Sequence, residues 1–314
     1  MLDEFGIKKV KISLPFRLDH VNCFFAEGND GYVIIDTGLN DHAAQKTWKP
    51  LIQNNKIESI LLTHLHPDHC GYAGKLQEIT RSAVYMSERD AIALNRIWTE
   101  EAIPKLVDDY HRADIDKTIT KEIVGATKNS LPFVTPLPTI NHYLTEGEKI
   151  KFGKYEYEIL FTPGHSEGLI CLYNRDKHLL FSTDHILPKI TPNISYWFYG
   201  EENPLLSYEH SLNKIKQLDI DYVIPSHGEP FTNVNRRIEE IWKHHVQNFE
   251  VILDAIKDSR TIFDVCKILF PRDLTTYDYQ FAIGETIAHL NYLRLKGECR
   301  RELVAGKWMY KREN

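Results

Sequence analysis

Short apolar runs of strand length alternate with helical spacing over about the first 230 residues. Several runs are bounded by Gly, Asn and Asp, which favours strands joined by turns. The predicted strands are 10–14, 21–26, 32–36, 57–62, 83–86, 155–161, 169–174, 178–182 and 222–225. Apolar residues three and four positions apart predict helices over 41–54, 72–80 and 208–218. Two β-rich halves with helices outside them are therefore expected.

Two further segments have helical spacing. The chain from Glu88 to about Leu131 is longer than a simple connection needs, so we predict a helical insertion over about 88–142. It either caps the active site or decorates the surface. Beyond about Glu229, helices are predicted over 234–259, from Thr261 onward and over 284–295, followed by a small hairpin. The predicted domains are 1–228 and a mainly helical 229–314.

A cluster of side chains that can bind metals follows the predicted strand 57–62, where residues 63–69 read THLHPDH. Neutral imidazole is the commonest zinc ligand, and a carboxylate adds charge and an oxygen donor. Ligands of open α/β sheets bind at the carboxyl ends of strands. His64 and His66 flank Leu65, so both can point to one side of an extended loop. Four ligand-type residues in this short span predict a metal site, whereas single histidines elsewhere are more simply core or surface residues.

The HxHxDH string resembles the signature of the metallo-β-lactamase superfamily, in its glyoxalase II-like branch. Further pieces of the family pattern occur in the family's order, reading IDTG at 35–38, TPGHS at 162–166, STDH at 182–185 and PSHG at 225–228. The resemblance covers roughly residues 10–230. It implies an α+β fold, a four-layered αββα sandwich, here with the helical insertion and a small C-terminal domain.

The helices and hairpin after residue 229 resemble a winged-helix module, which one branch of the superfamily carries at this place. Winged helices suggest DNA binding, but this stretch mixes acids and bases without a dominant basic face. Packing against the first domain or dimerisation is the favoured role, which leaves a homodimer open.

The resemblance implies two metal sites and the residues that hold them. His64, His66 and His165 hold the first ion, Asp68, His69 and His227 hold the second, and Asp184 bridges both. The implied cofactors are two Zn²⁺ ions, with Fe or Mn as alternatives in one or both sites. Asp68 is also the implied catalytic residue, because it helps to orient a metal-bridging hydroxide. Cys70 is expected to be a packed residue rather than a ligand or nucleophile.

Three other residues are predicted to support the ligands or touch the substrate, namely Asp36, His185 and Tyr196. Asp36 precedes Thr37 and Gly38, so it also suits an ordinary turn. In its functional role it would orient a histidine ligand from behind. Tyr196 belongs to the aromatic run 196–199, which we expect to shape the substrate pocket.

Three activities remain open at this point. The favoured one is dinuclear zinc-dependent hydrolysis of a small ester, thioester or lactone by the metal-bridging hydroxide. The second is a metal-dependent (ribo)nuclease of the same superfamily, although the further histidine motifs of such enzymes are not found. The third is a persulfide dioxygenase with a single iron. Metal analysis followed by a substrate panel would separate them.

Composition narrows the expected partners. The 314 residues carry a net charge of -6, which gives no reason to expect nucleic acid or an anionic membrane as partner. The five cysteines form no CxxC pair, which favours a reducing compartment. An acidic start and the lack of a long apolar run argue against a signal peptide or a transmembrane helix. We therefore expect a cytoplasmic enzyme acting on a small molecule.

Overall fold

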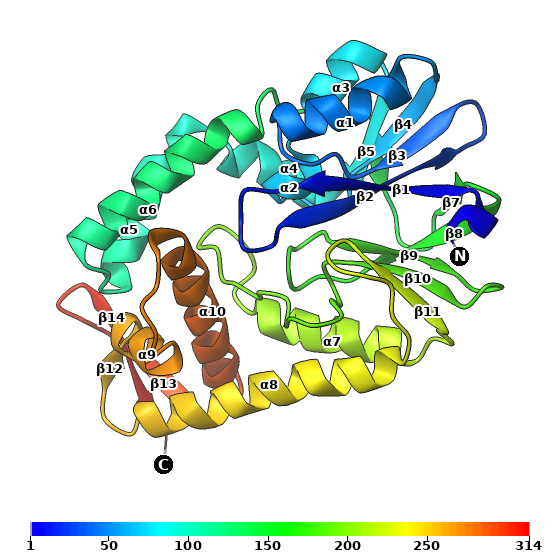
Figure 1. The fold of residues 1–314 in the computed structure, drawn as a ribbon. Coiled ribbons are helices and arrows are strands. Elements are labelled where there is room, and N and C mark those ends of the chain that lie inside the picture. Colours follow the sequence, from blue (N-terminus) through cyan, green and yellow to red (C-terminus); the bar gives the residue numbers. More distant parts are fainter. Residues whose placement is uncertain (1, 314) are drawn as a thin grey trace.

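The structure of this chain is a computed structural model that describes residues 2–313, without the side chains of residues 100, 103 and 277. The described residues form two large sheets that face each other (Figure 1). The first has the order β1-β2-β3-β4-β5-β6, with bounds Ile7–Ser13, His20–Glu27, Tyr32–Ile35, Ile57–Leu61, Ala83–Ser87 and His142–Leu144. The second has the order β11-β10-β9-β8-β7. Its strands, from β7 to β11, are Lys149–Phe152, Tyr155–Phe161, Ile170–Asn174, Leu179–Thr183 and Tyr222–Pro225.

Helices cover the outer faces of both sheets. Helices α1 (His42–Ile52) and α3 (Ala73–Thr80) cover the first sheet, and α7 (Pro204–Lys216) covers the second (Figure 1). The Asp41 carboxylate caps α1 by accepting from Ala44 N, which satisfies a backbone donor that the helix leaves free. Between the sheets, buried aromatic rings such as Phe24 and Phe181 meet edge to face, with 5.0 Å between ring centroids. The structure thus confirms the predicted four-layered αββα sandwich.

The strand order explains why distant motifs meet. Strands β3, β4 and β5 run parallel, and so do β10 and β11, so their carboxyl ends share an edge of the sandwich. Asp36 follows β3, and the HxHxDH loop follows β4 and enters the short helix α2 (Pro67–Cys70). Asp184 follows β10, and His227 follows β11 shortly after its last residue. His165 joins them from the loop between β8 and β9.

The predicted insertion forms an arm of helices. Helices α4 (Glu88–Ile97), α5 (Ile103–Arg112) and α6 (Lys117–Ser130) follow β5, with the short 3₁₀ helices η2 (Glu100–Ala102) and η3 (Leu131–Phe133) beside them. In Figure 1 the arm, in cyan and green, reaches away from the sandwich toward the C-terminal helices. Buried Tyr110 and Ile123 anchor the arm in the same apolar cluster as the C-terminal helices.

The residues after His227 form a mainly helical segment, called here the C-terminal unit, in yellow to red in Figure 1. Its elements are α8 (Val234–Ala255), β12 (Arg260–Thr261), α9 (Ile262–Leu269), α10 (Thr276–Leu295), β13 (Cys299–Val304) and β14 (Lys307–Arg312). Among described residues, its strands pair only with one another, in the order β12-β14-β13. Helix α10 begins well before Gly284, where its apolar spacing had placed the start, because Thr275 and Asp278 form a capping box.

Two glycines, one in α3 and one in α6, give a matched test of how tightly these helices are packed. A Cβ on Gly74 in α3 would lie 1.8 Å from the carbonyl oxygen of Pro136, whereas a Cβ on Gly125 in α6 meets nothing within 4 Å. We expect Gly74→Ala to lower the free energy of unfolding by about 1–3 kcal/mol through overpacking. Gly125→Ala should raise it by roughly 0.5–1 kcal/mol, because alanine loses less entropy in a helix. Urea unfolding measures both, and equal midpoints for the two variants would contradict this packing.

Candidate metal centre

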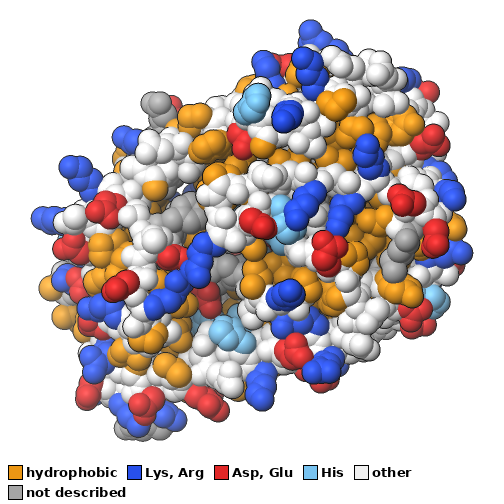
Figure 2. Space-filling view, viewed as in Figure 1, with side chains coloured by type: hydrophobic (Ala, Val, Ile, Leu, Met, Phe, Trp, Pro, Cys, Tyr) orange, Lys and Arg blue, Asp and Glu red, His pale blue; other side chains and the backbone are white. Residues whose placement is uncertain are grey.

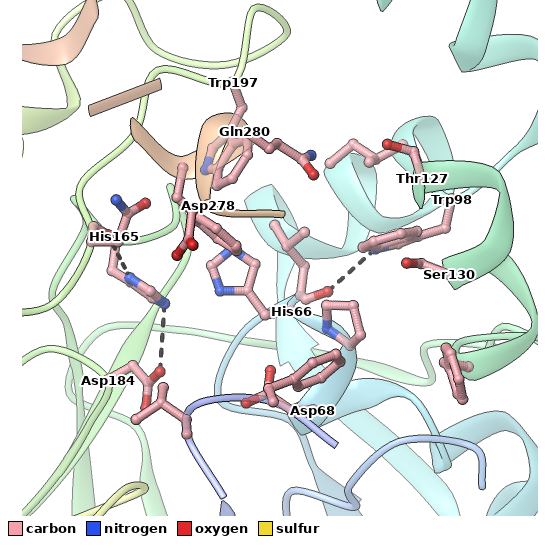
Figure 3. A pocket seen from close by; sticks show the side chains of 18 of the residues that line it. His66, Asp68, Trp98, Thr127, Ser130, His165, Asp184, Trp197, Asp278 and Gln280 are labelled. Carbon is pink, nitrogen blue, oxygen red and sulfur yellow. Dashed lines mark hydrogen bonds and ion pairs between the residues drawn. The ribbon is translucent and has the colours of Figure 1, made fainter. Parts of the chain in front are cut away.

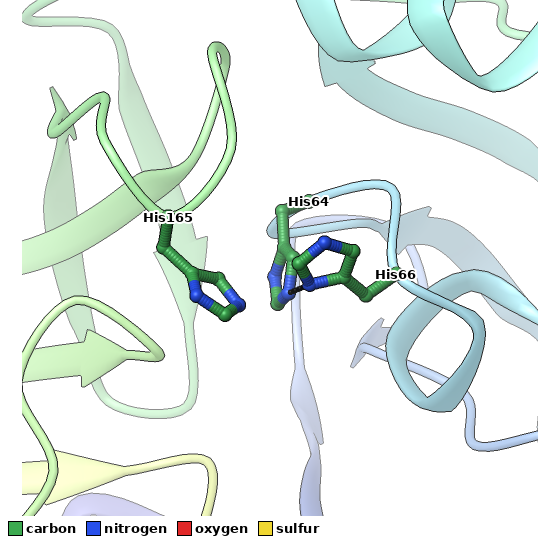
Figure 4. Close-up of side chains that lie close together, drawn as sticks. All are labelled: His64, His66 and His165. Atoms are coloured by element: carbon green, nitrogen blue, oxygen red, sulfur yellow. Dashed lines mark hydrogen bonds between the residues drawn. The ribbon is translucent and has the colours of Figure 1, made fainter. Parts of the chain in front are cut away.

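The structure brings all the predicted metal ligands together at one edge of the sandwich. Among the described residues, three groups of ligand atoms form, each with its atoms within 4.8 Å of one another. The groups are His64, His66 and His165; His64, His69 and Asp184; and Asp68, His69 and His227. Figure 4 shows the first group, in which His165 approaches the HxH loop from the opposite side. The first and third groups are the two ligand sets that the sequence resemblance implies.

Asp184 lies between the two sets. Its Oδ2 is 3.5 Å from His165 Nε2 in the first set. The same oxygen is 3.6 Å from His69 Nε2 and 3.4 Å from His227 Nε2 in the second. Asp68 belongs to the second set alone, with its Oδ2 3.5 Å from His69 Nε2 and 3.3 Å from His227 Nε2. Asp184 therefore occupies the place that a bridging carboxylate requires.

Four of the histidines are fixed from behind by their Nδ1 atoms. His69 donates to Asp36 Oδ2 at 2.8 Å, His165 to Asn193 O at 2.8 Å and His227 to His20 O at 2.7 Å, while His64 Nδ1 lies 3.1 Å from Thr63 Oγ1. These contacts hold the ring tautomers with Nε2 toward the middle. The ring of His66 has the opposite orientation to the other four: its Nδ1 faces the neighbouring ligand and lies 3.1 Å from His64 Nε2.

Asp36 supports the centre in the way expected of a residue behind a ligand. It is buried, and its carboxylate also accepts from Thr63 N and Thr63 Oγ1, both at 2.8 Å. Its backbone has a φ of 57°, a conformation that non-glycine residues adopt with some strain. The strained turn thus joins the end of β3 to the HxHxDH loop through one carboxylate.

The donor set fits metal cations. Nε2 of His69, His165 and His227, and Oδ1 of Asp184, are buried and have no hydrogen-bond partner among the described residues. A buried polar atom left in this way typically costs about 1–3 kcal/mol, so a group that satisfies several of them together is favoured. Imidazoles and carboxylates whose ligand atoms converge on one point are suitable ligands for divalent ions such as Zn²⁺.

The two halves of the centre differ electrostatically. Burial, together with the neighbouring imidazoles, holds the pKa of His64 well below its usual value and lowers that of His66 to about 3. In the other half, burial opposes protonation of His227, but Asp184 and Asp68 outweigh burial and raise its pKa to about 10. They raise the pKa of His69 in the same way. The carboxylates therefore favour positive charge in the second half of the site.

The metal centre faces a cavity of about 980 Å³ (Figure 3). His66, Asp68, His165, Asp184 and His227 form part of its wall. The insertion and α10 contribute much of the rest, so the insertion caps this face instead of decorating a remote surface. Side chains from these regions that line the cavity include Trp98, Leu106, Tyr110, Gln280 and Phe281.

Two predicted contact residues do not line this cavity, and the expectation of direct substrate contact is corrected for both. His185 is fully buried, and its ring packs edge-on against Tyr208, 5.2 Å away, because the chain turns back toward α7 after Asp184. Tyr196 packs against Phe198, and its backbone N–H bonds to Gly284 O in α10. The following residues of the aromatic run, 197–199, do line the cavity.

Asp90 is a supporting residue of the centre that no sequence motif predicted. This fully buried carboxylate accepts from Leu65 N at 2.9 Å, Ser166 Oγ at 2.7 Å and Gly168 N at 2.7 Å. It thereby ties the HxHxDH loop to the loop of His165. In the sequence, Asp90 stands three residues after Ser87, which is the spacing of an ordinary helix cap. Nothing in that pattern distinguishes a carboxylate that holds two ligand loops.

The C-terminal unit also reaches the centre. Asn193, whose carbonyl holds His165, donates from its side chain to Glu285 Oε2 of α10 at 3.0 Å. Burial, opposed by this hydrogen bond, raises the pKa of Glu285 to about 7. The ligand loop is therefore braced by a residue of helix α10, which no local sequence pattern indicates.

Comparisons with known proteins identify the family. Residues 16–227 match the family model of the metallo-beta-lactamase superfamily, and residues 249–313 match that of the metallo-beta-lactamase-like, C-terminal domain. The chain belongs to the metallo-β-lactamase superfamily, as its motifs predicted, and is a metal-dependent hydrolase of that superfamily.

Individual relatives agree with this assignment. A Bacillus subtilis (strain 168) protein named "Probable metallo-hydrolase YqjP" is 26% identical over 95% of this chain and 94% of its own length. The human "Acyl-coenzyme A thioesterase MBLAC2" is 26% identical over 53% of this chain and 58% of its own.

Solved structures show the same likeness. A beta-lactamase domain protein from Burkholderia ambifaria has a TM-score of 0.87 at 28% identity, covering 98% of this chain and 92% of that one. A metallo-beta-lactamase family protein from Thermus thermophilus has a TM-score of 0.84 at 28% identity, covering 98% of this chain and 99% of that one. Both matches extend through the C-terminal unit.

One further property concerns membranes. Among the residues that the structure describes, no helix combines the length and the apolar composition that crossing a bilayer demands.

Proposed function

We propose that this chain hydrolyses an ester, thioester or lactone with two divalent metal ions, most simply Zn²⁺, held by the seven residues of the centre. The observation that carries this proposal is the position of Asp184 between two otherwise complete ligand sets. His64, His66 and His165 would hold one ion, Asp68, His69 and His227 the other, and Asp184 both. The ions would supply a nucleophile near neutral pH by lowering the pKa of water, and would polarise the substrate carbonyl.

The residues of the chain supply positioning. Asp68 has 19% of its side chain exposed and lines the cavity, so its carboxylate can accept a hydrogen bond from an attacking water. The histidines are kept in one orientation by the contacts behind them, which lowers the reorganisation that the reaction needs. Cys70 is poorly suited to be a nucleophile. It is buried, its thiol donates to Leu65 O, and burial raises its pKa far above neutrality.

An acyl compound is favoured over the other candidate substrates by several observations. The thioesterase named among the relatives is one, and the largely hydrocarbon wall of the cavity is another. A nucleic acid would be favoured by a continuous basic surface. On the face shown in Figure 2, Lys and Arg are instead interspersed with Asp and Glu. Helix α10 also packs into the interior of the protein, where buried Ile283, Ile287 and Leu290 hold it. We therefore propose a small-molecule substrate.

Metal content tests the proposal. Protein purified without chelator should hold close to two metal ions per chain, mostly zinc, by elemental analysis. Asp184→Asn should weaken the pair, because the amide keeps the size but removes the charge between the two sets. Chelator treatment should abolish hydrolysis, and added Zn²⁺ should restore it. A single iron per chain, with oxygen consumption on persulfides, would replace hydrolysis by the dioxygenase reaction.

A further inference from the structure

We propose that the substrate of this enzyme carries a long hydrocarbon chain, which lies in the cavity between the metal centre and helix α6. The inference rests on the proposed function, because the reacting carbonyl must lie at the metal centre while the chain extends from it. It departs from the small substrate that the motifs alone suggested. The evidence comes from the size of the cavity, the chemistry of its walls and the residues opposite the metal centre.

The cavity is too large for a small ester. Its volume of about 980 Å³ is at the upper end of the roughly 300–1,000 Å³ typical of pockets for drug-sized ligands. A small ester at the metal centre would leave most of this space filled by water against apolar walls, which is unfavourable. A hydrocarbon chain would remove that apolar surface from water and stabilise the complex.

The walls come from separate parts of the chain and are mostly hydrocarbon. Trp98 and Leu106 belong to the insertion, Leu187 and Trp197 follow β10, and Phe281 belongs to α10. An enclosing surface built from the sandwich, the insertion and the C-terminal unit suits an elongated ligand better than a compact one. The insertion and the C-terminal unit together enclose a binding site that the sandwich alone would lack.

Several charged side chains of the wall are engaged by the protein itself. Arg17 lies 3.6 Å from the carboxylate of Asp278, and Arg96 donates to the carbonyl of Tyr199 at 3.2 Å. The carboxylate of Asp109 lies 3.7 Å from the guanidinium of Arg112. These three charged groups of the wall already have partners within the protein, which limits the charge that they offer to a ligand.

Helix α6 closes the cavity opposite the metal centre. In Figure 3, Thr127 and Ser130 lie across the cavity from His165 and Asp184. Thr127 donates its hydroxyl to Ile123 O at 3.0 Å, and Ser130 donates its own to Ala126 O at 2.9 Å. Since both hydroxyl donors are satisfied within the helix, this wall can accept the apolar end of a chain. Thr127 is therefore placed to limit the chain length.

The first experiment varies chain length on the metal-loaded enzyme. p-Nitrophenyl alkanoates from two to sixteen carbons place the chain on the acyl side, and alkyl acetates of matching length place it on the alcohol side. In one series kcat/KM should rise by up to about fourfold per methylene, from roughly 0.8 kcal/mol per buried CH₂, and then level off. The series that rises identifies the side that carries the chain. Flat profiles in both series would overturn the proposal.

A binding measurement separates this inference from the proposed function. Calorimetric titration of the metal-loaded protein with butanoate, octanoate and dodecanoate should show affinity rising with length, since the carboxylate is common to all three. Tight binding of dodecanoate without hydrolysis of any ester would leave the chain site standing and refute the hydrolase. Equal affinities alongside ester hydrolysis would do the reverse.

A pair of variants locates the end of the chain. Thr127→Trp should lower the affinity for dodecanoate at least tenfold and move the kcat/KM maximum to shorter chains, because the indole occupies the space by α6. Lys128→Trp adds the same bulk on the exposed face of the helix and should change neither quantity. Identical length profiles for the two folded variants would contradict the assignment, and the titrations on the unmodified enzyme test the chain site even if Thr127→Trp does not fold.

Discussion

Replacing Asp68 by asparagine is expected to lower turnover by about 10²–10³, with little change in folding. Asp68 contributes an oxygen to the second ligand set and is the most exposed member of that set, with its carboxylate at the wall of the cavity. The amide keeps the size and one oxygen donor but loses the negative charge. That charge attracts the second ion and accepts a hydrogen bond from the attacking water, so both contributions weaken together.

The measurement uses the best ester or thioester substrate at saturating zinc and neutral pH, with circular dichroism to verify folding. Cys70→Ser is the matched control, because Cys70 lies two residues away and its thiol donates to the carbonyl of Leu65. Its turnover should stay within a few-fold of the original. An inactive, folded Cys70→Ser beside an active Asp68→Asn would indicate covalent catalysis by cysteine and overturn the metal assignment.

The convergence of the ligand residues could be predicted because each follows a strand whose apolar run is legible in the sequence. Parallel neighbours such as β3 and β4 bring their carboxyl ends to the same edge, and the family resemblance implied which of the residues at these ends share a site. The bond from His69 to Asp36 fits the supporting role predicted for Asp36, whereas the left-handed backbone at Asp36 was not predicted. Local pattern thus places each ligand-type residue at the end of a strand, and the resemblance supplies their grouping into two sets.

Residues fixed by long-range packing were beyond that reasoning. The packing of His185 depends on Tyr208, and that of Tyr196 on its contacts with Phe198 and α10, so neighbours in sequence could not reveal that neither residue lines the cavity. The spacing rule also missed the start of α10, since its first turns are fixed by a capping box rather than by an apolar stripe. The bracing of Asn193 by Glu285 likewise depends on the packing of α10 beside the loop that holds Asn193.

The largest stability effect is expected at Asp90. Asp90→Ala leaves three buried donors without an acceptor, on Leu65, Ser166 and Gly168. Each such donor typically costs about 1–3 kcal/mol, so we expect the free energy of unfolding to fall by roughly 3–5 kcal/mol. The metal content should fall with it, because the loops of His64–His66 and His165 lose their common anchor.

Urea unfolding and elemental analysis of the same preparations test this expectation. Glu88→Ala is the matched control, since Glu88 is an exposed residue in the first turn of the same helix, and its effect should stay within about 0.5 kcal/mol. If Asp90→Ala unfolded at the same urea concentration as Glu88→Ala and kept its metal, the carboxylate would be dispensable. Asp90→Asn separates charge from shape. It keeps one acceptor but presents an amide N–H to a donor, so its stability should lie between those of the original chain and the alanine variant.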